Sequence, residues 1–310
     1  MTKDNADVRV AASPINWHND DFPILGTDTS VETMLAGMQS AGYEGTALSS
    51  LFPTTAKDLR PLLEHFDLRL ASGWHCTYLL TEDREKERER FIEFVQFLSQ
   101  METEFLTVAE CSWCPFKPYP PGRFDQHFQA LAVPLFPYQL PKLSPEQWRL
   151  LGEGLTEFSR IAADSGITVG YHPHMQTLVQ DAEQLALLAD AAPDLQFTID
   201  TGHLAFAGAD PLLILERYIG RTVYLHVKNV RERVVEAARG GSMSFEFAVV
   251  EGAFTVPGDG GIDFVPIFEL LKRYEYRGWL LVEAEQNPLT SDPLLYAKLA
   301  REYIERSAGW

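Results

Sequence analysis

Short, β-rich apolar runs alternate with longer amphipathic runs along most of the chain. Apolar residues that recur every three or four positions indicate one face of a helix, whereas short apolar runs between turn residues are typical of strands. The short runs predict strands at residues 8–12, 45–49, 68–74, 105–109, 167–171, 196–199, 222–227 and 279–282. The longer runs predict helices at residues 30–41, 56–65, 85–100, 144–164, 182–191, 211–219, 264–274 and 293–305.

Strict alternation of eight strands with eight helices predicts a parallel sheet that closes into a (β/α)8 TIM barrel. We therefore expect one α/β domain over residues 1–310. A doubly wound open sheet is the alternative, but it would normally carry a glycine-rich turn after an early strand, which this sequence lacks. The order Ser144-Pro145-Glu146-Gln147 adds a local signal, because serine, proline and glutamine at these positions are typical of a helix start.

Residues 111–143 interrupt the alternation after the fourth strand. This stretch is rich in proline and aromatic residues, which is incompatible with a helix or an ordinary strand. Long loops in compact domains are usually binding loops or lids, so we expect this one to cover a site. The pair Cys111-x-x-Cys114 lies in the loop, has no second pair for zinc and does not open a helix, so it favours neither a metal site nor redox chemistry.

Barrel enzymes carry their chemistry at the carboxyl ends of the strands. Loops are usually polar, which is enough to explain any single polar residue after a strand. It does not explain why ionisable residues follow several strands whose carboxyl ends meet at one open end of the barrel, its mouth. The residues of interest at the predicted strand ends are Trp74 and His75, Glu110, His172 and His174, Asp200 and His203, His226 and Lys228, and Glu283 and Glu285.

Asp200, His226 and Glu283 each follow an apolar run directly, so we expect their side chains to point into the mouth. Buried charges without partners are costly, and a divalent cation is a common partner for such a set. Mixed nitrogen and oxygen ligands suit Mn²⁺, Co²⁺, Fe²⁺, Zn²⁺ or Mg²⁺. His172 and His174 are two residues apart on an extended segment and face the same side, so either could be a ligand, an acid or base, or a structural histidine.

A formal net charge of -18 argues against nucleic acids and anionic membranes as partners, but leaves small polar substrates open. The N-terminal residues have no signal-peptide pattern, and no apolar run approaches the ~20 residues of a spanning helix. Three cysteines do not make a disulfide framework. We therefore expect a cytoplasmic protein with a small-molecule substrate; whether it forms a homo-oligomer is left open.

Seven short segments, spread over nearly the whole chain, carry a family resemblance. They are residues 14–21 (PINWHNDD), 42–46 (GYEGT), 171–175 (YHPHM), 200–203 (DTGH), 225–229 (LHVKN), 252–260 (GAFTVPGDG) and 278–286 (GWLLVEAEQ). In them the chain resembles the xylose-isomerase-like barrel superfamily of sugar isomerases, epimerases and dehydratases, and within it the inosose dehydratases of inositol catabolism. The last two segments together are the ones that point to the dehydratase-like branch.

The resemblance implies a hydro-lyase that depends on Mn²⁺ or Co²⁺, with Asp200, His226 and Glu283 at metal positions. The fourth position, on the fifth strand, is a glutamate in many relatives; here it falls on His172 or His174, and we take His172 as the ligand. Asn229 stands where an aspartate is expected, and the loop at 111–143 is longer than expected. Both departures bear on the substrate rather than on the fold.

The implied reaction is the loss of water from a cyclic keto-polyol such as 2-keto-myo-inositol through an enediolate. Expected catalytic groups are a base (His174 or Glu283, then Glu110), an ammonium beside the oxyanion (Lys228, unless it pairs with a site carboxylate) and an acid (His75 or His203). Expected substrate contacts are His203, Trp17, Trp74 and Glu285, and His203 could instead orient Asp200.

Three other functions fit parts of this pattern. A sugar isomerase or epimerase needs the same metal but two opposed bases and no leaving group. An endonuclease of the same superfamily needs a basic face, which the charge of -18 opposes. A sugar-binding barrel without activity would hold no metal.

Overall fold

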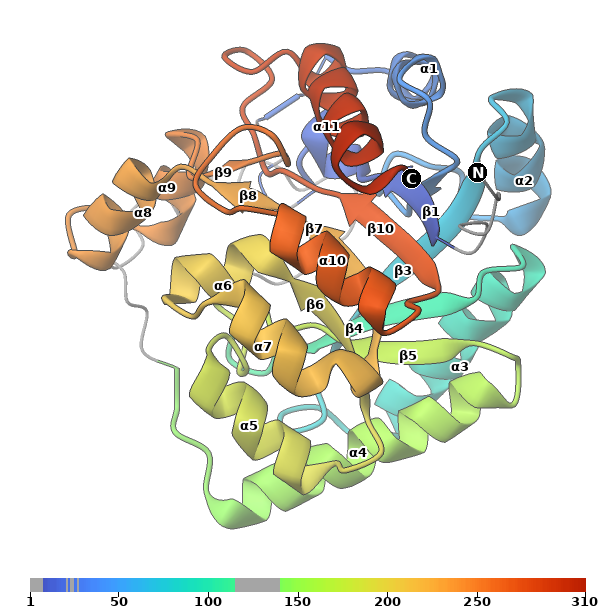
Figure 1. The fold of residues 1–310 in the computed structure, drawn as a ribbon. Coiled ribbons are helices and arrows are strands. Elements are labelled where there is room, and N and C mark those ends of the chain that lie inside the picture. Colours follow the sequence, from blue (N-terminus) through green and yellow to red (C-terminus); the bar gives the residue numbers. More distant parts are fainter. Residues whose placement is uncertain (1–7, 21, 23–24, 27, 115–139) are drawn as a thin grey trace.

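The predicted strands close into a barrel in which every neighbouring pair is parallel (Figure 1). The structure, a computed structural model, describes residues 8–20, 22, 25–26, 28–114 and 140–310. The barrel strands are β1 (Val8–Ala12), β2 (Gly45–Ala47), β3 (Arg69–Thr77), β4 (Phe105–Glu110), β5 (Thr168–Tyr171), β6 (Gln196–Asp200), β7 (Thr222–Val227) and β10 (Gly278–Val282). Pairing of β1 with β10, from Val8 opposite Gly278 to Ala12 opposite Val282, closes the barrel and confirms the predicted fold.

The predicted helices form a layer around the barrel (Figure 1). They are α1 (Val31–Ser40), α2 (Ala56–His65), α3 (Arg84–Gln100), α4 (Pro145–Ala163), α5 (Ala182–Ala191), α7 (Pro211–Tyr218), α10 (Val265–Arg273) and α11 (Pro293–Ala308). The start predicted at Ser144 is confirmed, since Ser144 and Gln147 cap each other reciprocally. Across the described ranges, none of the helices combines the length and the apolar character needed to cross a membrane.

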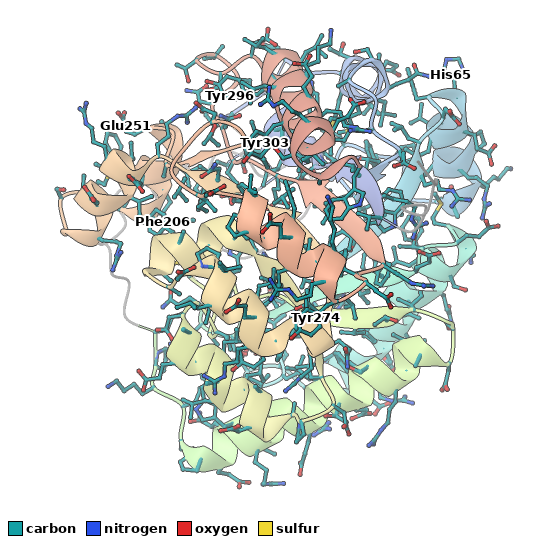
Figure 2. All side chains as sticks on the ribbon, in the orientation of Figure 1. His65, Phe206, Glu251, Tyr274, Tyr296 and Tyr303 are labelled. Atoms are coloured by element: carbon teal, nitrogen blue, oxygen red, sulfur yellow. The ribbon has the colours of Figure 1, made fainter. Side chains whose placement is uncertain are left out.

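Short elements between β6 and β10 were not predicted; all but α8 (Glu232–Arg239) have seven residues or fewer, which is too few to show a clear period in the sequence. They are α6 (Thr201–Ala207), a 3-10 turn (Ile219–Arg221), β8 (Asn229–Val230), α8 (Glu232–Arg239), α9 (Phe245–Val250) and β9 (Phe254–Thr255). A further 3-10 turn, Pro14–Asn16, follows β1. Phe206 of α6, labelled in Figure 2, packs against Phe245 and Phe254 at ring distances of 5.1 and 5.7 Å. This second small core fixes α6, and with it the end of β6, beside the barrel mouth.

Asn229 has a structural role that an aspartate could not fill completely. Its Oδ1 accepts hydrogen bonds from the N–H groups of Val230 (2.8 Å) and Ile262 (2.7 Å). Its Nδ2 donates to the carbonyl oxygen of Ile262 (3.2 Å), and a carboxylate has no N–H for this bond. The departure at this position therefore ties the glycine-rich loop before α10 to β8.

Side chains on each barrel strand alternate between the barrel interior and the helix layer, as the period of a strand requires. On β4, the Thr107 hydroxyl lies 3.2 Å from Ser72 of β3 and 3.3 Å from Thr198 of β6, inside the barrel. Leu106 and Val108 instead join the hydrophobic core between strands and helices. This alternation decides which polar residues reach the mouth. The expected binding loop at 111–143 lies for the most part outside the described residues.

Candidate metal centre and active site

The interior-facing side chains at the carboxyl ends of the strands surround a cavity of about 130 Å³. Polar and aromatic residues that line it are Ser13, Asp20, Ser72, Trp74, Thr107, His172, His174, His226 and Glu283. They lie on β3, β4 and β7, just after the ends of β5 and β10, and in the segment after β1, so the barrel itself assembles the site.

Asp200 ends β6 and also begins α6. Its Oδ1 accepts a hydrogen bond from the backbone N–H of His203 (2.9 Å), which is the bond of an N-cap. Its Oδ2 is buried and makes no hydrogen bond, although it lies 3.4 Å from His226 Nδ1 and 3.3 Å from Lys228 Nζ. One oxygen thus holds the helix while the other stays available for a ligand.

His226 lies directly opposite Asp200 on β7. Its Nδ1 is 3.4 Å from Asp200 Oδ2 and 3.5 Å from Glu283 Oε2, and forms no hydrogen bond of good geometry with either. Burial alone would lower the pKa of His226, but the carboxylates of Glu283 and Asp200 outweigh it and raise this pKa to about 9. Without a metal ion, a proton on His226 therefore offsets part of the local negative charge.

His172 follows β5 and is completely buried, yet neither of its ring nitrogens has a hydrogen-bond partner. Burial lowers the pKa of His172 well below its usual range, so the ring is neutral and keeps a free lone pair. Donor atoms of His172, Asp200 and His226 all lie within 4.8 Å of one another. A buried polar ring with no partner is costly, and a cation between these three residues would supply one.

Lys228 lies behind the carboxylates and is completely buried. Its ammonium is 2.7 Å from Glu283 Oε1, 2.7 Å from Glu285 Oε1 and 3.3 Å from Asp200 Oδ2. Burial would lower the pKa of Lys228, but these three carboxylates outweigh it and raise this pKa well above its usual value. The sequence left open an oxyanion contact or a salt bridge, and the structure shows the salt bridges.

Lys228 packs against the motif Asp-Thr-Gly-His, residues 200–203. A side chain at Gly202 would place its Cβ 2.5 Å from Lys228 Cγ, so only glycine fits beside the lysine stem. Thr201 Oγ1 accepts a hydrogen bond from the Lys228 N–H (3.1 Å) and donates to the Lys228 carbonyl (2.6 Å). The motif therefore joins the ends of β6 and β7.

The charges of this cluster fit a divalent cation. Three carboxylates (Asp200, Glu283 and Glu285) face one ammonium (Lys228), which leaves a net charge of -2 when His226 is neutral. A buried net charge of this size needs compensation. Imidazole and carboxylate donors suit divalent cations such as Mn²⁺, Co²⁺ or Zn²⁺, so the donor set can hold a divalent metal.

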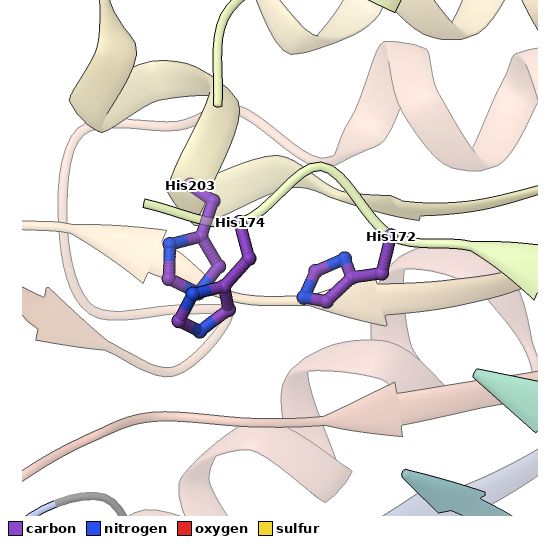
Figure 3. Close-up of side chains that lie close together, drawn as sticks. All are labelled: His172, His174 and His203. Carbon is purple, nitrogen blue, oxygen red and sulfur yellow. The ribbon is translucent and has the colours of Figure 1, made fainter. Parts of the chain in front are cut away.

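His174 and His203 lie beside His172, with His203 coming from α6 (Figure 3). His174 Nδ1 donates to the carbonyl of Met175 (2.7 Å), which leaves its Nε2 unprotonated and free to accept a proton. His203 Nδ1 accepts from the Met175 N–H (3.4 Å), and its Nε2 lies 3.3 Å from Glu285 Oε1. His203 is thus held at both nitrogens, whereas His174 is held at one.

His75 and Glu110 are not brought into the mouth, because both lie at helix-facing positions of their strands. His75 packs against Phe91 and Phe94 of α3 at ring distances of 5.3 and 5.5 Å. The carboxylate of Glu110 accepts hydrogen bonds from the Thr77 hydroxyl (2.7 Å) and from the N–H groups of Leu79 and Ser112. We therefore correct the expectation that these two residues act as acid or base.

Trp17 and Glu285 are also absent from the cavity wall. Trp17 is buried in the core, where its ring lies against Gly37 of α1, and Glu285 is buried on Lys228. Trp74 does line the cavity, with 38% of its surface exposed. Of the four expected substrate contacts, the structure thus brings only Trp74 to the cavity; His203 lies behind it.

Sequence reasoning missed Asp20, Ser72 and Thr107 as cavity residues. Ser72 and Thr107 could have been found by counting in twos along each strand from the interior position at its end. Asp20 belongs to the segment PINWHNDD, and its carboxylate accepts hydrogen bonds from the Ser50 hydroxyl (2.6 Å) and N–H (3.0 Å). Only the chain path after β1 brings Asp20 over the mouth.

Replacing His75 by leucine is expected to change kcat by less than about tenfold, far from the roughly 10²–10⁴-fold loss of a proton donor. Burial, assisted by Arg90, lowers the pKa of His75 to about 3. In the unfolded chain this histidine binds a proton below about pH 6.5, whereas in the folded protein it stays neutral down to a much lower pH. A fall in pH therefore favours the unfolded chain, and His75 lowers the stability of the folded protein. Denaturant titrations at pH 7 and pH 5 should show the wild type losing about 2 kcal/mol more unfolding free energy than the variant. Equal losses would contradict the assigned environment.

A closed barrel with a buried set of histidines and carboxylates at its carboxyl mouth defines an enzyme of the (β/α)8 class, and comparison with known proteins gives its family. The family model described as xylose isomerase-like TIM barrel matches residues 31–306, so the chain belongs to this family.

Curated relatives named inosose dehydratase are 36–38% identical to this chain. The one from Clostridium tetani (strain Massachusetts / E88) is 38% identical over 97% of this chain and 98% of its own length. This similarity over the full length makes the protein a lyase of the dehydratase type.

Solved structures show the same fold at low identity. L-ribulose 3-epimerase has a TM-score of 0.65 at 17% identity and covers 97% of this chain and 95% of its own. The IOLI protein, solved with a bound zinc atom, has a TM-score of 0.65 at 12% identity and covers 97% of this chain and 98% of its own.

Proposed function

We propose that this protein is a metal-dependent dehydratase that removes water from a cyclic keto-polyol such as 2-keto-myo-inositol, as a step of inositol catabolism. The observation that carries the proposal is the buried cluster of Asp200, His226, Glu283 and His172, in which donor atoms have no partners. Together with Glu285 and Lys228, this cluster has a net charge of -2 when His226 is neutral. The relatives named inosose dehydratase support the substrate class.

We assign Asp200, His226, Glu283 and His172 as the residues that would hold the metal. The zinc atom in the IOLI structure, which shares this fold, supports a divalent metal in this protein. The resemblance favours Mn²⁺ or Co²⁺, with Mg²⁺, Fe²⁺ and Zn²⁺ as further candidates. A bound divalent cation would act as a Lewis acid that makes the C–H beside a ketone acidic and stabilises the developing negative charge.

The remaining cavity residues provide the acid–base chemistry. His174 Nε2 accepts the proton from the carbon beside the ketone, which leaves an enediolate, and the same imidazolium returns a proton to the departing hydroxyl group. Asp20 accepts hydrogen bonds from substrate hydroxyls, held in place by Ser50. Trp74 covers an apolar face of the ring. Lys228 does not line the cavity, so it does not contact the substrate. Its role is to hold the carboxylates in place through its ion pairs.

Replacing His174 by glutamine is expected to lower kcat by roughly 10²–10⁴-fold while the metal content stays near that of the wild type. His172→Gln should instead lower the metal content, because His172 is the assigned ligand. Metal per chain by elemental analysis and kcat at saturating substrate separate the two effects. His65→Gln is the matched control, since His65 is exposed on α2, away from the mouth (Figure 2). Loss of metal from His174→Gln with retention in His172→Gln would reverse these two assignments.

The function itself is tested with purified, Mn²⁺-loaded protein and 2-keto-myo-inositol. We expect the ultraviolet absorbance of a dione to appear in proportion to the substrate consumed. Formation of an isomeric ketose without the dione would establish the isomerase or epimerase alternative and overturn the dehydratase proposal. His174→Gln protein serves as the inactive control in the same assay.

A further inference from the structure

All three cysteines of the chain lie together in one small cluster. Cys76 is on β3, and Cys111 and Cys114 follow β4 in a turn in which the Cys114 N–H donates to the Cys111 carbonyl (3.0 Å). They share one small cluster with Ala109 and Tyr78, and all three are free thiols. The sequence favoured no redox role for Cys111-x-x-Cys114, because only the pairing of β3 with β4 adds the third thiol.

Cys76 is the thiol most exposed to solvent and the one best placed to ionise. The indole N–H of Trp74 donates to its sulfur (3.1 Å), and Arg90 donates to its carbonyl (2.8 Å). A hydrogen bond from Cys111, together with these groups, lowers the pKa of Cys76. Thiolate character together with access to solvent is what makes a cysteine react with oxidants.

Cys111 lies between the other two thiols and interacts with both. The hydrogen-bonded turn brings the Cα atoms of its first and fourth residues within about 7 Å, which overlaps the range that a disulfide spans. Cys76 is in register with Ala109, two residues before Cys111 on the neighbouring strand. Cys111 can therefore pair with Cys114 without a large backbone movement, and Cys76 can reach Cys111 from the side.

We propose that these cysteines form a hydroperoxide-sensitive dithiol site in which Cys76 reacts first and a Cys111–Cys114 disulfide is the product. The Cys76 thiolate attacks the peroxide, which gives a sulfenic acid and releases hydroxide. The Cys111 thiol then displaces water to form a Cys76–Cys111 disulfide. The Cys114 thiolate attacks the Cys111 sulfur and releases the Cys76 thiolate. Overall, two thiols lose two electrons and two protons, and hydrogen peroxide becomes two molecules of water.

The site is connected to the cavity through Trp74. The ring that donates to Cys76 also packs edge-on against His172 (5.3 Å) and His174 (5.5 Å). In the disulfide product Cys111 no longer has a thiol to donate to Cys76, so the sulfur that accepts the indole hydrogen bond differs between the reduced and oxidised states. The thiol chemistry does not depend on the proposed function, and its test uses no substrate.

The test treats reduced, desalted protein with hydrogen peroxide, followed by thiol titration and intact mass measurement. We expect free thiols to fall from three to one per chain, with a mass loss of 2 Da that dithiothreitol reverses. Peptide mapping should place the bond between Cys111 and Cys114. The proposal would be overturned if all three thiols stayed free at a peroxide dose that already oxidises methionine. A disulfide between chains on a non-reducing gel would also overturn it.

Three variants test the order of the steps. Cys76→Ser should slow the loss of thiols about tenfold, because Cys111 and Cys114 are less reactive. Cys114→Ser should stop at a Cys76–Cys111 disulfide, and Cys111→Ala should accumulate a sulfenic acid on Cys76 that dimedone traps. Thermal unfolding of each reduced variant checks that it is folded. Wild-type oxidation rates in folded Cys76→Ser would contradict the role of Cys76 as the first thiol.

Discussion

Asp200→Asn protein is expected to retain its fold and lose its metal. The asparagine Oδ1 still accepts the hydrogen bond of the His203 N–H, so the cap of α6 is preserved. The change removes the negative charge that faces His172 and His226, where the donor atoms converge within 4.8 Å. Metal per chain should fall below about 0.2, and kcat/KM should fall on the order of 10³-fold, because a Lewis acid contributes several kcal/mol.

Glu104→Gln is the matched control for this variant. Glu104 pairs with Arg9 at the amino-terminal end of the barrel, away from the mouth, so its metal content and activity should equal those of the wild type. Far-UV circular dichroism and thermal unfolding establish that both variants are folded. Full metal occupancy in Asp200→Asn would contradict the assignment. It would point instead to the neighbouring group of His172, His174 and His203.

Lys228→Met is expected to destabilise the metal-free protein strongly. Methionine fills the volume of the lysine stem but leaves Asp200, Glu283 and Glu285 buried without their ammonium. Removing one partner of a buried ion pair costs about 3–5 kcal/mol, which lowers Tm by about 10 °C in a domain of this size. Added Mn²⁺ should raise the Tm of the variant more than that of the wild type, because the cation replaces part of the missing positive charge.

Lys298→Met on α11 is the control, because Lys298 is exposed and a surface change usually alters stability by no more than about 0.5 kcal/mol. Scanning calorimetry with and without Mn²⁺ gives both quantities. A Tm of Lys228→Met within about 2 °C of the wild type would show that the three carboxylates do not depend on this lysine.

The sequence by itself determined the barrel, its order of elements and the strands that carry the site. Strand and helix periods are local, and Asp200 and Glu283 each come directly after an apolar run. Asp200, His226 and Glu283 could therefore be recognised together, since parallel strands in a barrel all end at the same face. The capping box at Ser144 was readable for the same reason, because all its contacts lie within four residues.

Only the tertiary structure decided which of these side chains meet. A shift of one residue turns a strand side chain from the interior to the helix layer, and this separates Trp74 from His75 and leaves Glu110 outside the mouth. The position of Lys228 among three carboxylates depends on the register of β6, β7 and β10. The three thiols meet because β3 pairs with β4, a contact between residues more than thirty positions apart. Such long-range contacts leave no period in the sequence, so they could not be predicted from it.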